Sequence, residues 1–413
     1  MTHRVAITGA GIISSIGSDL HQVTNHLRNG RSGIKAVEGW REHGLKSLVA
    51  GTIDNADLLR KNSGIDQELL LSMSNSSLFC ALAARAAVED SGVDSSALAS
   101  RRTGCIVGTG ISGTDAIYRG GSALYDGKIR RVSPFAALEA MSNSASAHLA
   151  QLFSVGGRSY SLNAACATSA HAIGHASELI RSGSLDLAIA GGGEELNPIV
   201  AGAFNAMRTA LSTHFNDSPK QASRPFDVDR DGFVLAEGAG IVILERLEHA
   251  IARGAKIRGE VIGYGATSGS RDMVQPEADG RSEIACMQAA LSDAGLEPAD
   301  IDYINAHATS TVLGDLAEGR ALQTTFPKSP PVSSTKGLTG HSLGAAGAQE
   351  IIFCLTMLEE GFLAPSVNIE TLDSAFSELN LIREPAVTTI DTALSNSFGF
   401  GGSNASIIVR RFG

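Results

Sequence analysis

Short apolar runs rich in β-type residues alternate along the chain with alanine-rich stretches of helical period. Examples of the runs are "RVAITGAG", "CIVGTG", "DLAIAGGG" and "GIVILERL", and a helical example is "SSLFCALAARAAVEDSG". A strand that is apolar at successive positions is buried on both faces, so helices must cover both faces of its sheet. The alternation therefore predicts an α/β fold with largely buried sheets.

Glycines mark the predicted ends of several helices. They stand in "EDSGV", "RSGSL", "DAGLE" and "EEGFL", each about one residue beyond the last position of the helical period. Glycine adopts the left-handed conformation that closes a helix at no steric cost, so we expect these helices to end there.

Two pairs of segments resemble each other across the chain. "NAACATSAHAIGHASELIRSG" pairs with "TGHSLGAAGAQEIIFCLTMLEEG", and "DGFVLAEGAGIVILER" pairs with "NSFGFGGSNASIIVRR". The repeat predicts two halves of similar architecture, residues 1–255 and 256–413. No proline-rich or charged linker separates them, so we expect them to pack as one body.

Composition excludes several classes of protein. The chain start, "MTHRVAITGAGIISSIG", lacks the pattern of a secretory signal, and no run of about 18 apolar residues occurs, so we expect neither secretion nor a membrane partner. The five cysteines are an odd number without a CxxC pair, which favours a reducing cytoplasmic location over a disulfide framework or a zinc ribbon. The formal charge of −10 argues against nucleic-acid binding.

Three short motifs resemble sites of other chemistry, but each lacks a required residue. "GAGIISSIG" imitates a dinucleotide fingerprint, but Ser14 occupies the third glycine position. "GHSLG" imitates the nucleophile turn of hydrolases, yet no histidine follows His341 to serve Ser342 as a base. His171 and His175 have the spacing of a helical metal pair without the glutamate of a metalloprotease motif. We favour a tight turn for the first motif, an inert serine for the second, and helix packing for the two histidines.

Cys166 stands apart from the other cysteines, which lie within apolar helical or strand patterns. Its neighbours in "SLNAACATSAHAIGHA" are small and polar, so a substrate could approach closely. A thiol at the start of a helix meets free backbone N–H groups and the positive end of the helix dipole, which favour the nucleophilic thiolate. Cys166 is therefore a candidate nucleophile, and a buried structural thiol is the alternative.

Two glycine-rich loops supply further candidates. "NAHATSTVLGD" presents His307 after an apolar run, and "SSTKGLTGHSLGAAG" presents Lys336 and His341 before a helix. A single histidine after a strand can be a satisfied core residue, but two of them beside one lysine favour a catalytic group. The turn "NSFGFGGSNAS" adds backbone N–H groups that could complete an oxyanion site.

The order of these motifs resembles that of the β-ketoacyl-ACP synthases, the condensing enzymes of fatty-acid synthesis. The resemblance covers nearly the whole chain, and the first three of its segments look most like synthase I. It is carried by "ACATSAHAIG", "GGGEEL", "LSTHFND", "RPFDVDRDGFVLAEGAG", "GYGATS", "NAHATSTVLGD", "STKGLTGHSLGAAG" and "SNSFGFGGSNA". It implies a thiolase-like fold, a five-layered αβαβα sandwich of two similar halves.

The resemblance also implies an acyltransferase that performs decarboxylative Claisen condensation. Cys166 would take an acyl group from an acyl carrier protein (ACP), and malonyl-ACP would then extend that chain by two carbons. His307 and His341 would promote decarboxylation, and the backbone N–H groups of Cys166 and Phe400 would hold the oxyanion.

Supporting roles follow from the same resemblance. Lys336 would set the electrostatics of the site, paired with Glu318, while Asp315 would be structural. Thr309 and Thr311 match threonines that contact the pantetheine arm. Phe398 and Phe400 match phenylalanines that gate malonyl access. No redox cofactor and no metal would be needed, because the phosphopantetheine belongs to the carrier protein.

The sequence departs from the family pattern in three places, and two of these departures concern the loops around the site. Ala308 stands where the family usually has glycine. Ile111 occupies the position of a bulky gate in synthase II, and together with Phe204 and Met207 it is a candidate for the acyl pocket. The chain-length class is therefore open.

The third departure is at the expected carrier-docking surface. Residues 60–75 carry leucines where family members often have basic residues. Docking could depend instead on Lys128, Arg130 and Arg131, for which solvated surface charge is the alternative.

Two other functions remain open beside fatty-acid elongation. One is a ketosynthase of a polyene or polyketide pathway, because synthase I and synthase II features are mixed. The other is a non-catalytic chain-length partner of a heterodimer, although Cys166, His307 and His341 are all present. The resemblance itself implies a homodimer.

Overall fold

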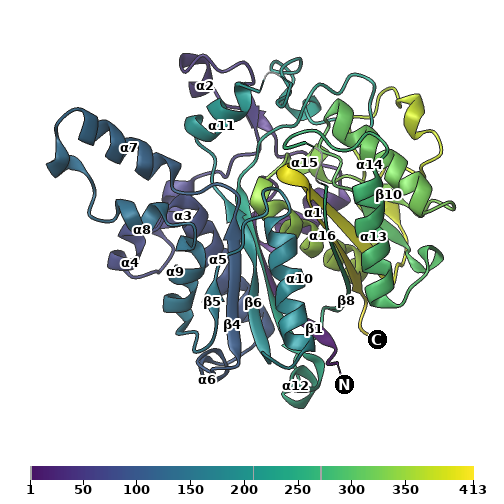
Figure 1. The fold of residues 1–413 in the computed structure, drawn as a ribbon, viewed down its shortest axis with the longest axis horizontal. Coiled ribbons are helices and arrows are strands. Elements are labelled where there is room, and N and C mark those ends of the chain that lie inside the picture. The colour runs from purple at the N-terminus through teal and green to yellow at the C-terminus, as the bar shows by residue number, and fades with distance from the viewer. Residues whose placement is uncertain (1, 208, 270–271) are drawn as a thin grey trace.

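One hydrogen-bonded sheet of ten strands runs through the protein in the computed structural model, which describes residues 2–207, 209–269 and 272–413 (Figure 1). The strand order is β10-β9-β13-β14-β8-β1-β7-β6-β4-β5. These strands are β1 Val5–Ile13, β4 Thr103–Thr109, β5 Ser159–Tyr160, β6 Leu187–Glu194, β7 Gly238–Arg246, β8 Gly259–Ser268, β9 Tyr303–Asn305, β10 Val332–Ser333, β13 Thr392–Gly399 and β14 Ser403–Arg410.

The sheet consists of two five-stranded halves with the same connectivity. The first half runs β1-β7-β6-β4-β5 and the second runs β8-β14-β13-β9-β10, with parallel and antiparallel pairs in the same places. Within the sheet, as far as the structure describes it, a short antiparallel contact between β1 and β8, Val5–Ile7 against Gly259–Val261, joins the two halves. The predicted similarity of the two halves is confirmed.

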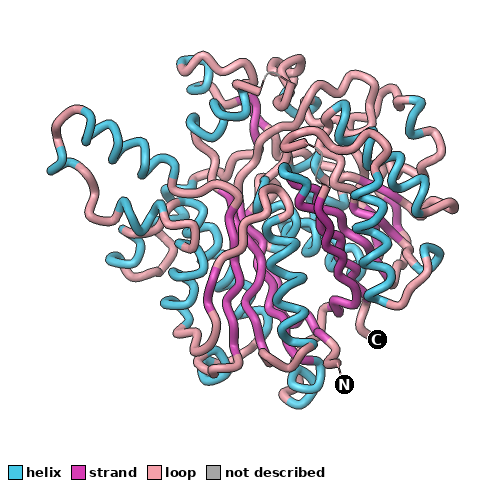
Figure 2. The backbone as a smooth tube through the Cα atoms, in the orientation of Figure 1, coloured by secondary structure: helices cyan, strands magenta, loops and turns pink. Residues whose placement is uncertain are grey.

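Helices form three layers around the two halves of the sheet. Helices α10 (Thr168–Arg181) and α16 (Ala346–Glu360) pack against each other and against strands of both halves. Helices α5 (Asn75–Ser91) and α9 (Ser144–Phe153) cover the outer face of the first half, and α13 (Arg281–Ala294) lies on the second with α14 (Val312–Thr325) beside it. Each interface between layers has its own apolar core. Figure 2 shows the strands enclosed by helices, as the predicted αβαβα sandwich requires.

The smaller elements lie in the connections between these layers. Helix α7 extends from the side of the body, at the left of Figure 1. These elements are α1 Leu20–Arg28, β2 Lys35–Ala36, α2 Gly39–Glu42, β3 Val49–Ala50, α3 Ala56–Lys61, α4 Gln67–Leu71, α6 Ser95–Leu98, α7 Thr114–Tyr125, α8 Ala136–Ala140, α11 Pro198–Asn205, α12 Leu247–Ala252, α15 Lys336–Thr339, β11 Phe362–Leu363 and β12 Ala386–Val387. Among the described residues, no helix has the length and apolar character that a membrane span needs.

The predicted glycine helix ends are confirmed. Gly92, Gly295 and Gly361 cap α5, α13 and α16 in the left-handed conformation, with φ of 62°, 65° and 66°. Gly183 follows the cap of α10 by one residue and has φ of 72°.

Glycines in the first strand of each half let the outer helix approach the sheet. A Cβ on Gly11 of β1 would lie 2.0 Å from the Ala83 carbonyl oxygen of α5. A Cβ on Gly265 of β8 would lie 2.1 Å from the Cys286 carbonyl oxygen of α13. In both halves, a glycine in the first strand thus allows the outer helix to lie close to the sheet.

We predict that Gly265→Ala lowers the free energy of unfolding by more than about 2 kcal/mol, because the methyl group meets helix backbone that cannot move aside. Thermal unfolding followed by circular dichroism measures the change. Gly39→Ala is the control, since a Cβ there meets nothing within 4 Å and alanine favours the helix α2 that Gly39 begins. Equal melting temperatures for wild type and Gly265→Ala would contradict this account of the packing.

Candidate active site

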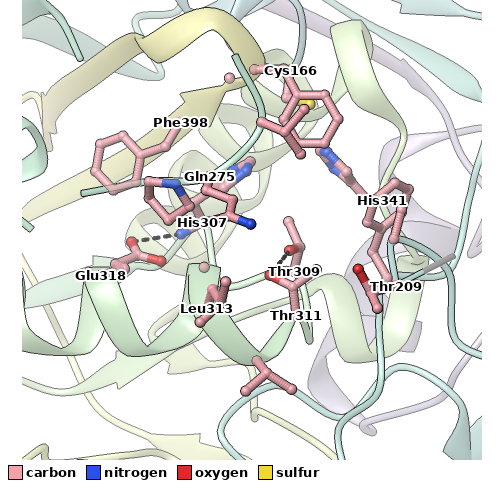
Figure 3. Close-up of a pocket in the computed structure, with 18 of the residues that line it drawn as sticks. Cys166, Thr209, Gln275, His307, Thr309, Thr311, Leu313, Glu318, His341 and Phe398 are labelled. Atoms are coloured by element: carbon pink, nitrogen blue, oxygen red, sulfur yellow. Dashed lines mark hydrogen bonds between the residues drawn. The ribbon is translucent and has the colours of Figure 1, made fainter. Parts of the chain in front are cut away.

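A cavity of about 790 Å³ is lined by residues from both halves of the chain (Figure 3). Its wall contains most of the site residues predicted from the sequence, which come from segments far apart in the chain. These are Cys166, Phe204, Met207, His307, Thr309, Thr311, Glu318, His341, Phe398 and Phe400. Lys336 and Asp315 are buried, and neither they nor Ile111 line this cavity.

Cys166 lies in a strained turn just before α10. Ala165 has φ of 49°, a left-handed conformation that a residue with a Cβ adopts only when its surroundings enforce it. The Thr168 hydroxyl supplies that constraint, since it accepts from the Ala164 N–H at 2.9 Å and donates to the Ala165 carbonyl at 2.7 Å. The turn directs the thiol into the cavity, where the backbone N–H groups of Phe400 and of Cys166 itself point at Sγ.

The resting state of Cys166 differs from the sequence prediction. We expected the helix start to favour the thiolate, but burial raises the pKa of the Cys166 thiol to about 12. The positive charge of Lys336 and the two backbone N–H groups lower that pKa by less than burial raises it. The expectation of a resting thiolate was wrong, because the sequence does not show how completely the turn is covered.

His307 and His341 face each other across the cavity. Their ring centroids lie 5.2 Å apart with the rings nearly perpendicular, at 85°. Burial, followed by the charge of Lys336, lowers the pKa of both imidazoles well below the ordinary value. Both rings are therefore neutral near pH 7, and each presents one N–H donor and one acceptor. Among the described residues, neither ring nitrogen of His341 has a hydrogen-bond partner, nor has Nδ1 of His307.

Lys336 makes a different ion pair from the predicted one. Its ammonium group binds the carboxylate of Glu350 on α16, and both side chains are almost fully buried. The predicted pairing with Glu318 was wrong. Glu350 lies one turn into a helix that is buried along almost its whole length, so the two charges meet only because the fold brings α16 next to Lys336.

Glu318 instead holds the loop that carries His307. Its carboxylate accepts the backbone N–H of His307 at 2.8 Å and that of Ala308 at 2.6 Å, as well as the Asn396 amide at 3.1 Å. Ala308 has its Cβ in the buried core, so the departure from glycine is accommodated. Asp315 acts in the same way, accepting the N–H groups of Phe226 and Ser310 at 3.1 Å.

The residues predicted to contact the arm of a substrate line the cavity, as do Phe204 and Met207, which are predicted to contact its chain. The Thr309 and Thr311 hydroxyls lie 3.2 Å apart, and Phe398 packs on His307 with ring centroids 5.9 Å apart. Phe400 contacts Phe204 at 6.3 Å between centroids. Phe204, Met207 and Ile111 pack against an apolar cluster that includes Cys166. We call this cluster the acyl-side cluster; its buried members are Trp40, Ala50, Cys166, Val200, Ala201, Ala210, Leu211, Phe233, Leu235 and Leu343.

The candidate docking residues lie outside the cavity. Lys128, Arg130 and Arg131 are exposed beyond the end of α7, and Lys128 bonds to Asp126 at 2.9 Å. In the segment 60–75, Leu71 is exposed while Leu69 and Leu70 pack on the outer core of the first half.

The residues of the rejected motifs make ordinary structural contacts. His171 and His175 bond to the hydroxyls of Tyr264 and Tyr160 at 2.6 and 2.8 Å. Ser342 donates to the Gln349 side chain at 2.6 Å, and Ser14 closes a tight turn with Gly17. No group of three or more potential His, Cys, Asp or Glu metal ligands occurs in the part of the chain that the structure describes.

Sequence reasoning missed three residues of the site. Glu350 neutralises Lys336, Phe233 packs edge-on against His341 at 5.5 Å, and the Gln275 side chain extends across the cavity in front of His307 (Figure 3). A glutamate in the apolar helix "AGAQEIIFCLTMLEE" was the one available signal.

We predict that alkylation of Cys166 by iodoacetamide accelerates about tenfold per pH unit up to pH ~10 without reaching a plateau, because the thiolate reacts and the pKa is about 12. Lys336→Met raises that pKa further, since it removes the positive charge, and slows alkylation about tenfold at any given pH. Peptide mapping by mass spectrometry assigns the label, with Cys166→Ala as the control. A plateau near the pH of an ordinary free thiol would contradict the burial effect.

The sequence matches two family models, the "Beta-ketoacyl synthase, N-terminal domain" over residues 2–250 and the "Beta-ketoacyl synthase, C-terminal domain" over residues 258–370. Curated relatives are similar over their full length. The 3-oxoacyl-[acyl-carrier-protein] synthase 1 of Haemophilus influenzae is 44% identical over 412 residues, and that of Escherichia coli is 45% identical over 417, with 99% of each chain covered in both cases.

Solved structures give the same result. A β-ketoacyl synthase from Burkholderia phymatum superposes with a TM-score of 0.93 at 34% identity, with 100% of both chains covered. A type II PKS ketosynthase in complex with its acyl-carrier protein superposes with a TM-score of 0.91 at 31% identity, also over the whole of both chains. The predicted resemblance is confirmed, and the chain belongs to the β-ketoacyl synthase family of condensing acyltransferases with the thiolase-like fold.

Proposed function

We propose that this protein extends fatty acyl chains on an acyl carrier protein, with Cys166 as the nucleophile and His307 and His341 as the groups that promote decarboxylation. The observation that carries the proposal is one cavity in which a buried thiol, two backbone N–H groups and two neutral imidazoles converge. The relatives named 3-oxoacyl-[acyl-carrier-protein] synthase 1, at 44% and 45% identity, support it.

In the first half-reaction, Cys166 attacks the thioester carbonyl of an acyl-ACP. The new C–S bond forms as the carrier's C–S bond breaks, and the proton of Cys166 leaves with the carrier thiol. The N–H groups of Cys166 and Phe400 stabilise the negative oxygen of the tetrahedral intermediate, because they already point at the reacting sulfur. The acyl chain then lies along the acyl-side cluster.

In the second half-reaction, malonyl-ACP enters past Phe398, with its pantetheine arm along Thr309 and Thr311. The bond to the carboxylate breaks, carbon dioxide leaves, and the electron pair forms an enolate at the thioester. His307 and His341 donate hydrogen bonds to the enolate oxygen. Both imidazoles are neutral, so each can donate such a bond without carrying a positive charge. The enolate carbon attacks the Cys166 thioester, the C–S bond breaks, and the Cys166 thiolate that leaves takes a proton from water, which restores the thiol.

Lys336 acts through its field rather than by proton transfer. It does not line the cavity and is bound to Glu350. Burial has the largest effect on the pKa values of Cys166, His307 and His341; the charge of Lys336 lowers those of the two imidazoles further and offsets part of the rise at Cys166. This keeps both imidazoles uncharged while favouring negative charge on sulfur and on the enolate. No redox cofactor and no metal is required by these steps, since the phosphopantetheine belongs to the carrier.

A ketosynthase of a polyketide pathway is the second candidate. The structural similarity to a type II PKS ketosynthase favours it, and the bulky Ile111 beside Cys166 is compatible with either pathway. The higher identity to synthase 1 relatives favours fatty-acid elongation. A non-catalytic chain-length partner is disfavoured, because such a protein has no use for the convergent Cys166, His307 and His341.

The carrier protein is the proposed macromolecular partner. We assign its docking to Lys128, Arg130 and Arg131, which are exposed beyond α7 and stand out on a chain of formal charge −10. The two substrates are acyl-ACP and malonyl-ACP.

A homodimer is the proposed assembly. Helix α7 projects from the body and exposes large apolar side chains that water disfavours. Tyr125 is 92% exposed, and Ile117 and Tyr118 are about equally exposed at 60% and 61%. A second copy would cover them.

Two further proposals concern location and organisation. A cytoplasmic location is supported by five free, buried cysteines. A division into residues 1–255 and 256–413 is supported by the family matches that end at residue 250 and resume at 258.

We predict that incubation with acyl-ACP adds the acyl mass to the wild-type protein and not to Cys166→Ala, as intact-protein mass spectrometry would show. His307→Ala and His341→Ala should still form the acyl-enzyme, while carbon dioxide release from malonyl-ACP falls by about a hundredfold or more. Absence of an adduct with every saturated, unsaturated and 3-ketoacyl primer would overturn the proposed function. Preferential loading of 3-ketoacyl primers would favour the polyketide pathway instead.

We predict that the wild-type protein is a dimer at micromolar concentration and that the double variant Tyr118→Glu/Tyr125→Glu is a monomer, because two charges would have to be buried at the contact. Light scattering coupled to size exclusion measures the mass. Val387→Glu is the matched control, since Val387 is 95% exposed on β12 and belongs to another surface. A wild-type monomer, or a dimer that persists in the double variant, would contradict this assignment of α7.

A further inference from the structure

The carboxylate of Glu194 joins three segments of the chain at the back of the acyl-side cluster. Glu194 is the last residue of β6 and is fully buried. Its Oε1 accepts the backbone N–H of Ile111 at 2.9 Å, and its Oε2 accepts those of Gly110 and Gly344, each at 2.9 Å. Gly110 and Ile111 follow β4, whereas Gly344 belongs to the turn that follows His341.

The three segments approach so closely that they leave no room for another side chain. A Cβ on Gly344 would lie 2.3 Å from the Gly110 backbone nitrogen and 2.9 Å from Glu194 Oε2. Leu343, beside Gly344, has φ of 47°, so its turn is held in a left-handed conformation that costs free energy. The bond from the Gly344 N–H to Glu194 helps to hold that turn in place.

Two of the residues fixed in this way belong to the same apolar cluster as Cys166. Leu343 is a buried member of the acyl-side cluster, and Ile111 packs against it. Both are therefore part of the apolar wall that this cluster forms around Cys166. Glu194 is also close enough to Cys166 for its charge to raise the pKa of the thiol.

We propose that Glu194 is a positioning residue for the acyl chain: it fixes the Ile111 loop against the Leu343 turn and so sets which chain lengths the wall beside Cys166 accepts. This inference rests on the proposed function, since only an acyl-enzyme has a chain to place. Glu194 touches no substrate and takes part in no bond change.

The geometry specifies what Glu194→Gln would disturb. A carboxylate accepts hydrogen bonds at both oxygens, but an amide has one oxygen and one NH₂ donor. The Gln oxygen satisfies Gly110 and Gly344 together from the position of Oε2. The NH₂ group then faces the Ile111 N–H, donor against donor, and the Ile111 loop is released from β6.

The test is the rate at which saturated acyl-ACPs of increasing chain length acylate Cys166, followed by mass spectrometry. Burial raises the pKa of Glu194 to about 8, so the expectation uses only its role as a hydrogen-bond acceptor. We expect Glu194→Gln to change the ratio of long-chain to short-chain acylation by about tenfold in favour of long chains, the factor expected when one buried N–H loses its acceptor. In Ile111→Ala, which already lacks the wall side chain, adding Glu194→Gln should change that ratio by less than about twofold.

Glu245→Gln is the matched control. Glu245 is another fully buried glutamate, on β7, and it binds Thr8 and Arg253 away from the cavity. The Glu245→Gln variant should be less stable than the wild type but have the same chain-length profile. An equal change of the profile in both variants would overturn the inference, because it would show a general loss of rigidity. If Glu194→Gln does not fold, Glu194→Asp applies the same test, because its carboxylate is one methylene too short to reach all three N–H groups.

The outcomes separate this inference from the proposed function. If the wild-type protein is acylated by no chain, the proposed function fails. If the wild-type protein is acylated and Glu194→Gln has the same chain-length profile, the positioning role of Glu194 fails while the proposed function stands.

Discussion

The buried ion pair between Lys336 and Glu350 determines the electrostatics of the whole site. An isolated ammonium group in such an interior would be too costly, so the carboxylate of Glu350 must be present for Lys336 to keep its charge. Glu350 is on α16, the helix that packs on both halves of the sheet, and the pair therefore depends on the assembled middle layer. After burial, the charge of Lys336 has the next effect on the site: it lowers the pKa values of His307 and His341 and offsets part of the rise at Cys166.

Buried carboxylates position the loops around this charge. Glu318 holds the His307 loop, Asp315 holds the segments around Phe226 and Ser310, and Glu194 holds the turn after His341. In each case a side-chain oxygen accepts backbone N–H groups that have no partner in a helix or strand. Loops without regular structure need such acceptors, because an unpaired buried N–H is costly. The segments that carry the proposed catalytic side chains His307 and His341 are therefore held in fixed positions.

The sequence predicted those parts of the structure that depend on local pattern. Alternating strands and helices, glycine helix ends, and the small-residue loops around Cys166, His307 and His341 are local, and the structure has each of them. The partner of Lys336 was mispredicted, because the choice between Glu318 and Glu350 depends on how α16 packs. The state of the Cys166 thiol was mispredicted for a related reason. A helix start is visible in sequence, whereas the depth of burial that outweighs it is not.

Burial of Cys166 has two opposite effects on catalysis. It disfavours the thiolate, since an anion loses its hydration, and this raises the pKa of the thiol. The same exclusion of water strengthens the two N–H groups at Sγ and the field of Lys336, which act on negative charge only when it develops in the reaction. A thioester delivered into the cavity meets these groups in place, but a small reagent that does not use them gains little. The exclusion of water thus disfavours the resting thiolate and, in the proposed reaction, stabilises the negative charge of the transition state.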